Sequence, residues 1–170
     1  LRRFAKSEIV PSNKDRFLRK ETLQGFVHDE ASAFFGGLAG NAGLFSTARD
    51  VARVYQMLLN GGEIDGQRYL SKETCQLFTT ETSKISRRGL GFDKPDADDP
   101  KKGNCAPAAP AEVYGHTGFT GTCAWVDPVN ELVYVFLSNR IYPDVTNRKL
   151  NQLHIRERIQ GAIYDAMKKK

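Results

Sequence analysis

An eight-residue run, Gly115-His116-Thr117-Gly118-Phe119-Thr120-Gly121-Thr122, combines an imidazole, threonine hydroxyls and three glycines directly ahead of an alternating apolar pattern. Because glycine has no Cβ, the backbone at Gly118 and Gly121 would let a substrate or another main chain approach closely. His116 can exchange a proton near neutral pH, and Thr117 can donate or accept a hydrogen bond. The run predicts an edge strand that contacts a ligand, with a Gly-rich hairpin turn as the alternative.

Other residues with reactive side chains are explained more simply as structure. His28-Asp29-Glu30 is an acid/base pair or, more simply, the polar first turn of a short helix. The glycines of residues 36–43 lack the Gly-Lys-Ser/Thr ending of a phosphate-binding loop. Three cysteines occur without Cys-x-x-Cys spacing or a histidine at ligand spacing: Cys75, Cys105 and Cys123. We therefore predict no metal and no other cofactor.

The composition is that of an ordinary globular domain. Apolar residues make up 40% and charged residues 26% of the 170 residues. No apolar run approaches the ~20 residues that a membrane-spanning helix needs, so we predict no membrane span. The chain begins Leu1-Arg2-Arg3, without an initiator methionine or the apolar core of a signal peptide. We therefore expect it to be a portion of a longer protein.

The net charge of +5 is distributed unevenly. Residues 1–20 carry seven Lys/Arg and two acidic residues, and residues 140–170 carry eight and three, so each end contributes +5 and the middle sums to −5. A nucleic-acid-binding protein is expected to gather its basic residues around a recognition element rather than at both ends. We therefore predict no nucleic-acid partner.

Capping residues and apolar spacing predict the elements that precede the run. Residues 1–27 are polar with weak periodicity and predict an irregular segment with a turn at Pro11-Ser12-Asn13. The elements predicted after it are a short helix over 28–35, a glycine-rich loop over 36–43, an amphipathic helix capped by Ser46 or Thr47 and ending at Asn60-Gly61-Gly62, a hairpin turn at Asp65-Gly66, and a helix from Ser71 to about Thr80.

Strands and a closing helix surround and follow the run. Four prolines and four aspartates in residues 93–112 favour an exposed, mobile loop, which we expect to border the run. The predicted strands are Val113–Thr117, Thr122–Val126 and Leu132–Ser138, and the third is apolar on both faces and so is expected inside the sheet. One long amphipathic helix over 150–166 should pack across them. The predicted fold class is α+β, an antiparallel meander packed by a C-terminal helix, with a helical segment inserted before it.

These motifs, in this order, resemble one family. The segments that carry the resemblance are the Gly-rich loop leading into Ser46-Thr47-Ala48-Arg49-Asp50-Val51-Ala52, the helix end Met57-Leu58-Leu59-Asn60-Gly61-Gly62, the strand Gly115-His116-Thr117-Gly118, Trp125, and the terminal helix. They resemble the C-terminal portion of the β-lactamase-related serine hydrolases, a group that includes penicillin-binding D,D-carboxypeptidases, class C β-lactamases and esterases. The resemblance implies a partial domain of the β-lactamase/transpeptidase-like fold over residues 1–170.

A narrower resemblance concerns the segments Val27-His28-Asp29-Glu30 through Gly43-Leu44-Phe45 and Arg87-Arg88-Gly89-Leu90-Gly91-Phe92-Asp93. They are similar to the module joined behind bacterial family-3 β-N-acetylglucosaminidases. This implies a link to cell-wall metabolism and a place in the bacterial cell envelope or periplasm.

The chemistry of this family uses three motifs, of which the sequence contains one. Ser-x-x-Lys supplies the nucleophile, Tyr-x-Asn or Ser-x-Asn a second proton carrier, and Lys/His-Thr/Ser-Gly a wall of the cleft. None of the eight serines has a lysine three residues on, and no tyrosine or serine has an asparagine two residues on. The resemblance therefore implies a nucleophile upstream of Leu1, and we expect this chain alone to be inactive.

Position in the third motif implies a role for each of its residues. His116 matches the Lys/His proton donor, and Thr117 matches the hydroxyl that binds a substrate carboxylate. Gly118 matches the residue whose missing Cβ admits the substrate backbone. The backbone amide of Phe119 matches the second donor of the oxyanion hole.

The resemblance also implies partners. The substrate would be a peptide or ester small molecule, and the nearest partner would be the missing N-terminal part of the same domain. Without that part, an open sheet edge and exposed apolar surface predict self-association. The alternative is a non-catalytic scaffold or binding module attached to a glycoside hydrolase, whose upstream sequence would lack Ser-x-x-Lys.

Overall fold

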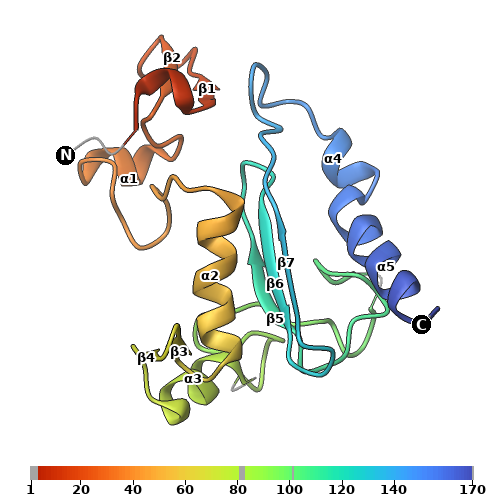
Figure 1. Cartoon of the computed structure of the whole chain (residues 1–170). Coiled ribbons are helices and arrows are strands. Elements are labelled where there is room, and N and C mark those ends of the chain that lie inside the picture. The colour runs from red at the N-terminus through yellow and green to blue at the C-terminus, as the bar shows by residue number, and fades with distance from the viewer. Residues whose placement is uncertain (1–3, 81–82, 101, 170) are drawn as a thin grey trace.

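A three-stranded antiparallel sheet lies at the centre of the structure (Figure 1). The structure is a computed structural model that describes residues 4–80, 83–100 and 102–169. The Leu1-Arg2-Arg3 start lies outside these residues. The strands pair in chain order, β5 (Tyr114–Thr117), β6 (Cys123–Asp127) and β7 (Leu132–Phe136). Helices and a small antiparallel sheet together make an α+β fold, as the sequence predicts.

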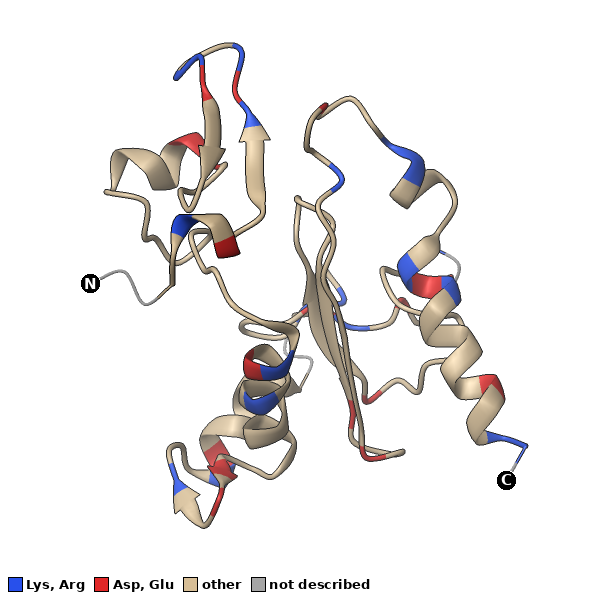
Figure 2. Ribbon diagram, turned by 45° about the horizontal axis from the view of Figure 1, so that its top comes forward, with Lys and Arg blue, Asp and Glu red and all other residues tan. Residues whose placement is uncertain are grey.

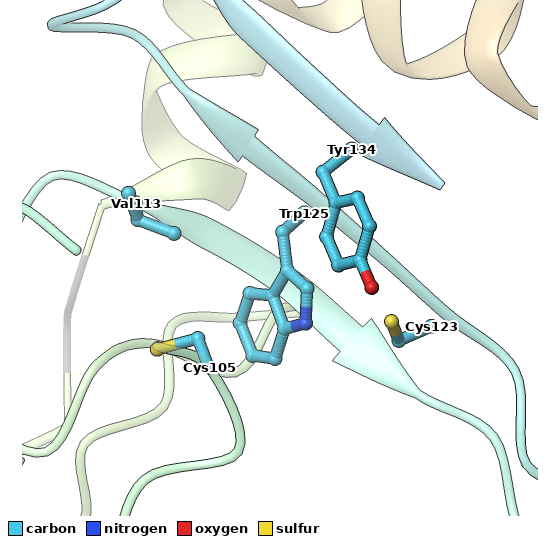
Figure 3. Close-up of a cluster of buried hydrophobic side chains, with 5 residues drawn as sticks. All are labelled: Cys105, Val113, Cys123, Trp125 and Tyr134. Carbon is cyan, nitrogen blue, oxygen red and sulfur yellow. The ribbon is translucent and has the colours of Figure 1, made fainter. Parts of the chain in front are cut away.

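Two helices cover the two faces of this sheet (Figure 1). Helix α2 (Ala48–Leu59) packs against β6 and β7 on one face, and α5 (Ile155–Met167) lies on the other. Strand β6 is the central strand, and all five of its residues are buried. On the α5 face, Ile163 packs against a buried cluster formed by Cys105, Val113, Cys123, Trp125 and Tyr134 (Figure 3). This cluster is the hydrophobic core.

The helix and hairpin that lead toward the sheet begin and end at their predicted caps. The Thr47 hydroxyl accepts a hydrogen bond of 3.1 Å from the amide of Asp50, and α2 ends at Asn60. A Cβ on Gly62, whose φ is +95°, would lie 2.1 Å from the Leu70 carbonyl oxygen, so only glycine fits there. The next elements are the hairpin of β3 (Glu63–Ile64) and β4 (Gln67–Arg68), with Asp65-Gly66 at its turn, and α3 (Lys72–Thr79), capped by Ser71.

The N-terminal segment is more ordered than its composition suggests. After a short 3-10 helix over Lys6–Glu8, β1 (Pro11–Lys14) pairs with β2 (Thr22–Gln24), so the predicted irregular segment with a turn at Pro11-Ser12-Asn13 is wrong. The chain reverses because the Asp15 carboxylate accepts hydrogen bonds from three successive backbone amides, those of residues 17, 18 and 19. The predicted helix after it is α1 (Glu30–Phe34), capped by Asp29.

The sheet and the closing helix differ from the prediction in two respects. Strand β7 lies at the edge of the three-stranded sheet rather than inside it. Helix α2 packs on one of its faces, and on the other the Tyr134 hydroxyl donates to the Arg156 carbonyl of α5. The closing helix is divided into α4 (Lys149–Gln152) and α5. His154, between them, has a left-handed backbone with φ of +49°, which no continuous α-helix accommodates.

The proline-rich segment after Phe92 is partly internal, contrary to the expectation of an exposed loop. Asp93 has no exposed surface, and Cys105 and Ala106 are each 2% exposed. The amide of Ala106 donates a hydrogen bond of 2.8 Å to the side chain of Gln160 on α5. As expected, the segment borders the glycine-rich run, because Asp93 forms a bridge with Gly115.

Charged residues of both signs share the same elements (Figure 2). On α2, Asp50 lies between Arg49 and Arg53, and on α5, Glu157 lies between Arg156 and Arg158. Among the described residues, no helix is both long enough and apolar enough to cross a bilayer.

Gly115→Ala should destabilise the protein. The new Cβ would lie 2.1 Å from the Ala124 carbonyl oxygen and 2.7 Å from the Trp125 ring, so we expect the free energy of unfolding to fall by about 1–3 kcal/mol. Urea denaturation measures it. Gly40→Ala is the matched control, because a Cβ at Gly40 has no atom within 4 Å. Equal losses for the two variants would contradict the close packing of β5 on β6.

Candidate functional site

The outer edge of β5 is closed at one end and open at the other. Gly115 and Asp93 exchange two backbone hydrogen bonds, of 2.8 and 3.0 Å. Because backbone N–H and C=O groups alternate in direction along a strand, those of Gly115 and Thr117 both point away from β6. The amide of Gly118 points back toward the other arm of the hairpin and donates to the Thr122 carbonyl at 2.8 Å. The free edge therefore begins at Thr117.

Next along this edge comes Phe119, whose amide was predicted to be an oxyanion-hole donor. Within the described part of the chain, this amide has no hydrogen-bond acceptor. The residue is 63% exposed. An unoccupied donor at a sheet edge is available to a substrate oxygen, although its role there stays a prediction.

The glycines after His116 are explained by the hairpin itself. A Cβ on Gly118 would lie 2.3 Å from the Thr122 hydroxyl oxygen, and one on Gly121 would lie 2.7 Å from that of Ser138. The amide of Gly121 also donates to the Gly118 carbonyl at 2.9 Å, which closes a tight turn. The run is thus both an edge strand and a glycine-rich turn, the two alternatives that the sequence leaves open.

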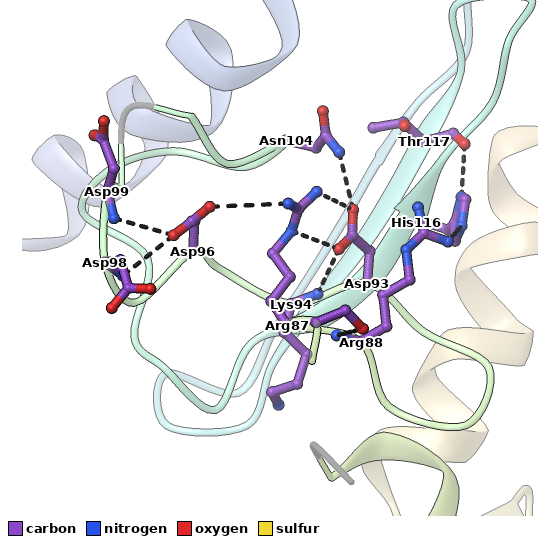
Figure 4. Close-up of polar contacts among 11 residues, drawn as sticks. Arg87, Arg88, Asp93, Lys94, Asp96, Asp98, Asp99, Asn104, His116 and Thr117 are labelled. Carbon is purple, nitrogen blue, oxygen red and sulfur yellow. Dashed lines mark hydrogen bonds and ion pairs between the residues drawn. The ribbon is translucent and has the colours of Figure 1, made fainter. Parts of the chain in front are cut away.

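His116 uses both of its ring nitrogens in hydrogen bonds (Figure 4). Its Nε2 lies 3.1 Å from Nη1 of Arg88, and its Nδ1 lies 2.7 Å from the carbonyl oxygen of Thr117. Because a guanidinium can only donate, Nε2 is the acceptor, and we assign the ring proton to Nδ1, which donates to Thr117. In this arrangement the imidazole is neutral and leaves no free N–H.

His116 and Thr117 are neighbours in a strand, so their side chains leave opposite faces of the sheet. His116 shares its face with Tyr114, whose ring contacts Phe92, which in turn contacts Tyr55 of α2. The Thr117 hydroxyl belongs to the face that carries Trp125. The structure thus brings together the backbone of the predicted site residues, but not the side chains of His116 and Thr117.

Two residues that sequence reasoning missed hold the Phe119 ring. His28 stacks on it with the rings parallel within 1° and their centroids 5.4 Å apart, and the Arg140 guanidinium lies 4.6 Å from its centroid. Burial and the charge of Arg19 lower the pKa of His28, which favours a neutral ring. The sequence singled out His28 as part of an acid/base pair or of a helix turn, and as part of a resemblance, but not as a neighbour of Phe119. Its contact with Phe119 has no local signal, because 91 positions separate the two residues.

The position of His28 is fixed by an ion pair in the N-terminal segment. Arg19 donates to the carbonyl oxygens of Val27 at 3.0 Å and His28 at 2.8 Å. The same guanidinium pairs with Asp15 at 2.6 Å, and this hydrogen bond holds the pKa of the Asp15 carboxyl far below its usual range. The β1–β2 hairpin is thereby tied to the residue that supports Phe119.

An open hollow of about 700 Å³ adjoins Phe119. Its lining includes two arginines and two amide side chains, and consists of Phe119, Arg140, Val145, Thr146, Arg148, Asn151 and Gln152. The Arg140 guanidinium also donates to the carbonyl oxygens of Val145 and Asn147 at 3.4 and 3.2 Å, which ties this loop to the glycine-rich turn. Polar and cationic groups thus lie beside the free end of β5.

A buried carboxylate organises the other side of the site (Figure 4). Both oxygens of Asp93 accept from Arg87, at 2.7 and 3.0 Å, and they also accept from the Asn104 side chain and the Lys94 amide. Burial alone would raise the pKa of Asp93, but the hydrogen bonds from Arg87 and Asn104 hold it below its usual value. The carboxylate is therefore ionised and fully paired at neutral pH.

The three cysteines are free and buried, as small core residues are. Burial raises the pKa of Cys105 to about 12 and that of Cys123 to about 11, and it also raises the pKa of Cys75. These thiols therefore stay protonated at neutral pH and make poor nucleophiles. In the part of the chain that the structure describes, no group of three or more His, Cys, Asp or Glu side chains is placed to hold a metal ion.

Comparison with known proteins identifies the family. The family model described as Beta-lactamase matches residues 6–157, which is most of the chain. The chain belongs to the beta-lactamase family. The resemblance drawn from the strand Gly115-His116-Thr117-Gly118 and the helix after Thr47 is thereby confirmed at the level of the family. The fusion to a glucosaminidase is a separate matter that this match does not address.

Several curated relatives of this beta-lactamase-family chain carry the same name. "Putative D-alanyl-D-alanine carboxypeptidase" of Escherichia coli (strain K12) is 37% identical over 135 residues, which are 79% of this chain and 31% of that protein. Proteins of the same name from Salmonella agona (strain SL483) and Salmonella typhi match with the same identity and coverage. The chain therefore spans about a third of the length of these relatives.

Asp93→Asn should destabilise this beta-lactamase-family chain at neutral pH. The variant removes the charge that pairs with Arg87, and we expect a loss of about 3 kcal/mol in the free energy of unfolding. Because the pKa of Asp93 is lower in the folded state, the stabilisation is present above the unfolded value near pH 4 and is lost as pH falls through the folded value. Denaturant titrations of both proteins at pH 7 and pH 3 should therefore differ less at pH 3. A gap that stays constant would contradict the assignment.

Proposed function

We propose that this chain is the C-terminal part of a serine hydrolase of the beta-lactamase family that cleaves amide or ester bonds, with D,D-carboxypeptidase activity as its specific form. The observation that carries the proposal is the free edge of β5, where the backbone of Thr117 points outward and the Phe119 amide has no acceptor among the described residues. The relatives' shared name supports the carboxypeptidase form. The nucleophile comes from a segment outside this chain, because no serine here has lysine three residues on.

In this proposal the β5 edge binds the substrate backbone as an additional strand. The Phe119 amide stabilises the oxyanion of the tetrahedral intermediate, and one such donor contributes about 2.7–4 kcal/mol. The Thr117 hydroxyl donates to the substrate carboxylate. Asp93 limits the length of the peptide that can lie along this edge, because its backbone already occupies the position at Gly115.

The biological setting is also a proposal. The relatives' name supports a role in cell-wall peptide metabolism and therefore a location in the bacterial cell envelope or periplasm. The segments Val27–Glu30 and Arg87–Asp93 support linkage to a β-N-acetylglucosaminidase through their resemblance to the module behind such enzymes. Reading the coding sequence upstream of Leu1 tests both points, because it reveals the Ser-x-x-Lys motif and any fused domain.

Active-site labelling tests the activity. The full-length protein should react with a fluorescent penicillin at a serine outside this chain and should hydrolyse a peptide that ends in D-alanyl-D-alanine. Thr117→Val should lower kcat/KM about 10- to 100-fold, because a hydrogen bond to a charged group is lost. Thr120→Val, in the same turn, is the control, since the Thr120 hydroxyl makes no hydrogen bond with the described residues. A full-length protein that is neither labelled nor active would overturn the proposal and favour a non-catalytic module.

We also expect this chain to self-associate when it is produced alone. Within the described residues, the outer edge of β7 has no partner strand, and apolar side chains such as Leu137 at 42% and Ile159 at 38% are exposed. Sedimentation velocity at increasing concentration should show dimers or larger species. A single monomeric boundary at high concentration would count against this expectation.

A further inference from the structure

Phe119 is held in the glycine-rich turn by its ring rather than by its own backbone. Among the described residues, neither its amide nor its carbonyl makes a hydrogen bond. Its neighbours are anchored, because the Gly118 amide donates to the Thr122 carbonyl and the Thr120 carbonyl accepts from the Arg140 amide, both at 2.8 Å. Gly118 has no Cβ and therefore does little to restrict the peptide bond that it shares with Phe119. The orientation of the Phe119 amide thus depends on what holds the side chain.

The face of the Phe119 ring is held by His28. The two rings are parallel within 1° and their centroids lie 5.4 Å apart, which is the geometry of an offset stack. Two side-chain torsions connect the Phe119 ring to its backbone, and each has a small set of preferred values. A fixed ring therefore restricts the Cα of Phe119 and the amide beside it.

His28 acts here through the face of its ring and not through its nitrogens. Its Nδ1 is buried without a hydrogen-bond partner, and within the described part of the chain its side chain makes no hydrogen bond. Burial and the charge of Arg19 lower its pKa, so the ring stays neutral beside the Arg140 guanidinium, which contacts the same Phe119 ring. Phenylalanine at position 28 would keep the stack and remove only the nitrogens.

The backbone of His28 is fixed independently of its side chain. The Arg19 guanidinium donates to the His28 carbonyl oxygen at 2.8 Å. The Asn139 side chain donates to the Ser12 carbonyl oxygen at 3.2 Å, which ties the β1–β2 hairpin to the segment that carries Arg140. A substitution of the His28 side chain leaves both contacts in place, so the effect of the stack can be measured by itself.

We propose that His28 is a positioning residue, which orders the Phe119 amide by stacking on the Phe119 ring and so prepares that amide to receive an oxyanion. This inference rests on the proposed function and concerns the same site. A hydrogen-bond donor contributes to catalysis when its position is fixed before the charge develops. Because the oxyanion forms only during the reaction, loss of the stack should lower kcat and leave KM unchanged.

Two variants of the full-length protein test this role. His28→Asn keeps a polar side chain without an aromatic ring and should lower kcat for a peptide ending in D-alanyl-D-alanine about 3- to 10-fold, because a ring pair is lost. His28→Phe keeps the ring and should keep the wild-type kcat. The control is His154→Asn, because His154 is exposed and asparagine tolerates its left-handed backbone. The proposal is overturned if His28→Phe loses as much kcat as His28→Asn, or if His28→Asn changes only KM.

NMR relaxation separates this proposal from the proposed function, because it does not require turnover. The full-length protein is labelled with 15N-phenylalanine, and the Phe119 amide is identified by the signal that Phe119→Leu lacks. Its order parameter should lie near ~0.85 in the wild-type protein and in His28→Phe, and below ~0.6 in His28→Asn.

An order parameter that His28→Asn leaves unchanged overturns the proposal, as does one that falls in an active protein without a loss of kcat. If it falls in a protein that neither hydrolyses the peptide nor reacts with penicillin, the proposed function fails and the ordering of Phe119 by His28 stands.

Discussion

The fully buried carboxylate of Asp93 is the constraint on which the site depends. Its side chain holds Arg87, Asn104 and the Lys94 amide, while its backbone closes the edge of β5 at Gly115. A buried carboxylate is tolerated only when it is paired and fully hydrogen-bonded, and that requirement fixes the geometry of the segment around it. The main effect of the Asp93–Arg87 ion pair is therefore on geometry. It fixes the point at which the outer edge of β5 is no longer paired, and it fixes the backbone next to Arg88.

The core and the site meet at one residue. A Cβ on Gly115 would lie within 3 Å of atoms of Ala124 and Trp125, so only glycine fits there. The same residue forms the bridge to Asp93. Tight packing on β6 thus brings β5 close enough for Asp93 to pair with its other edge. Trp125 is 1% exposed and belongs to the core cluster against which Ile163 of α5 packs, so Gly115 contacts the core on the α5 face of the sheet. Strand β5 is accordingly held by the hydrophobic core on one side and by the segment of the buried Asp93–Arg87 ion pair on the other.

Local signals predicted much of the fold, and long-range contacts account for what was missed. The caps of α2 and α3 and the turn at Asp65-Gly66 arise from hydrogen bonds within four residues, so the sequence reveals them directly. The β1–β2 hairpin depends on the Asp15 carboxylate and on Asn139, which donates to the Ser12 carbonyl 127 residues away. No periodicity encodes such a contact. At the site, the motif from His116 to Phe119 was visible in sequence, whereas Arg88 was visible only as part of a resemblance.

Positions 88 and 116 form a coupled pair rather than two independent choices. A lysine at position 116 would carry its own charge and repel the Arg88 guanidinium at the 3.1 Å separation seen here. A histidine instead accepts a hydrogen bond from that guanidinium through Nε2 and donates its own N–H to the Thr117 carbonyl oxygen. The family motif allows either residue at position 116, and the structure gives a physical reason for histidine in this chain. Because the Arg88 guanidinium contacts the side chain at position 116, a neutral hydrogen-bond acceptor such as histidine is favoured there over a second cation.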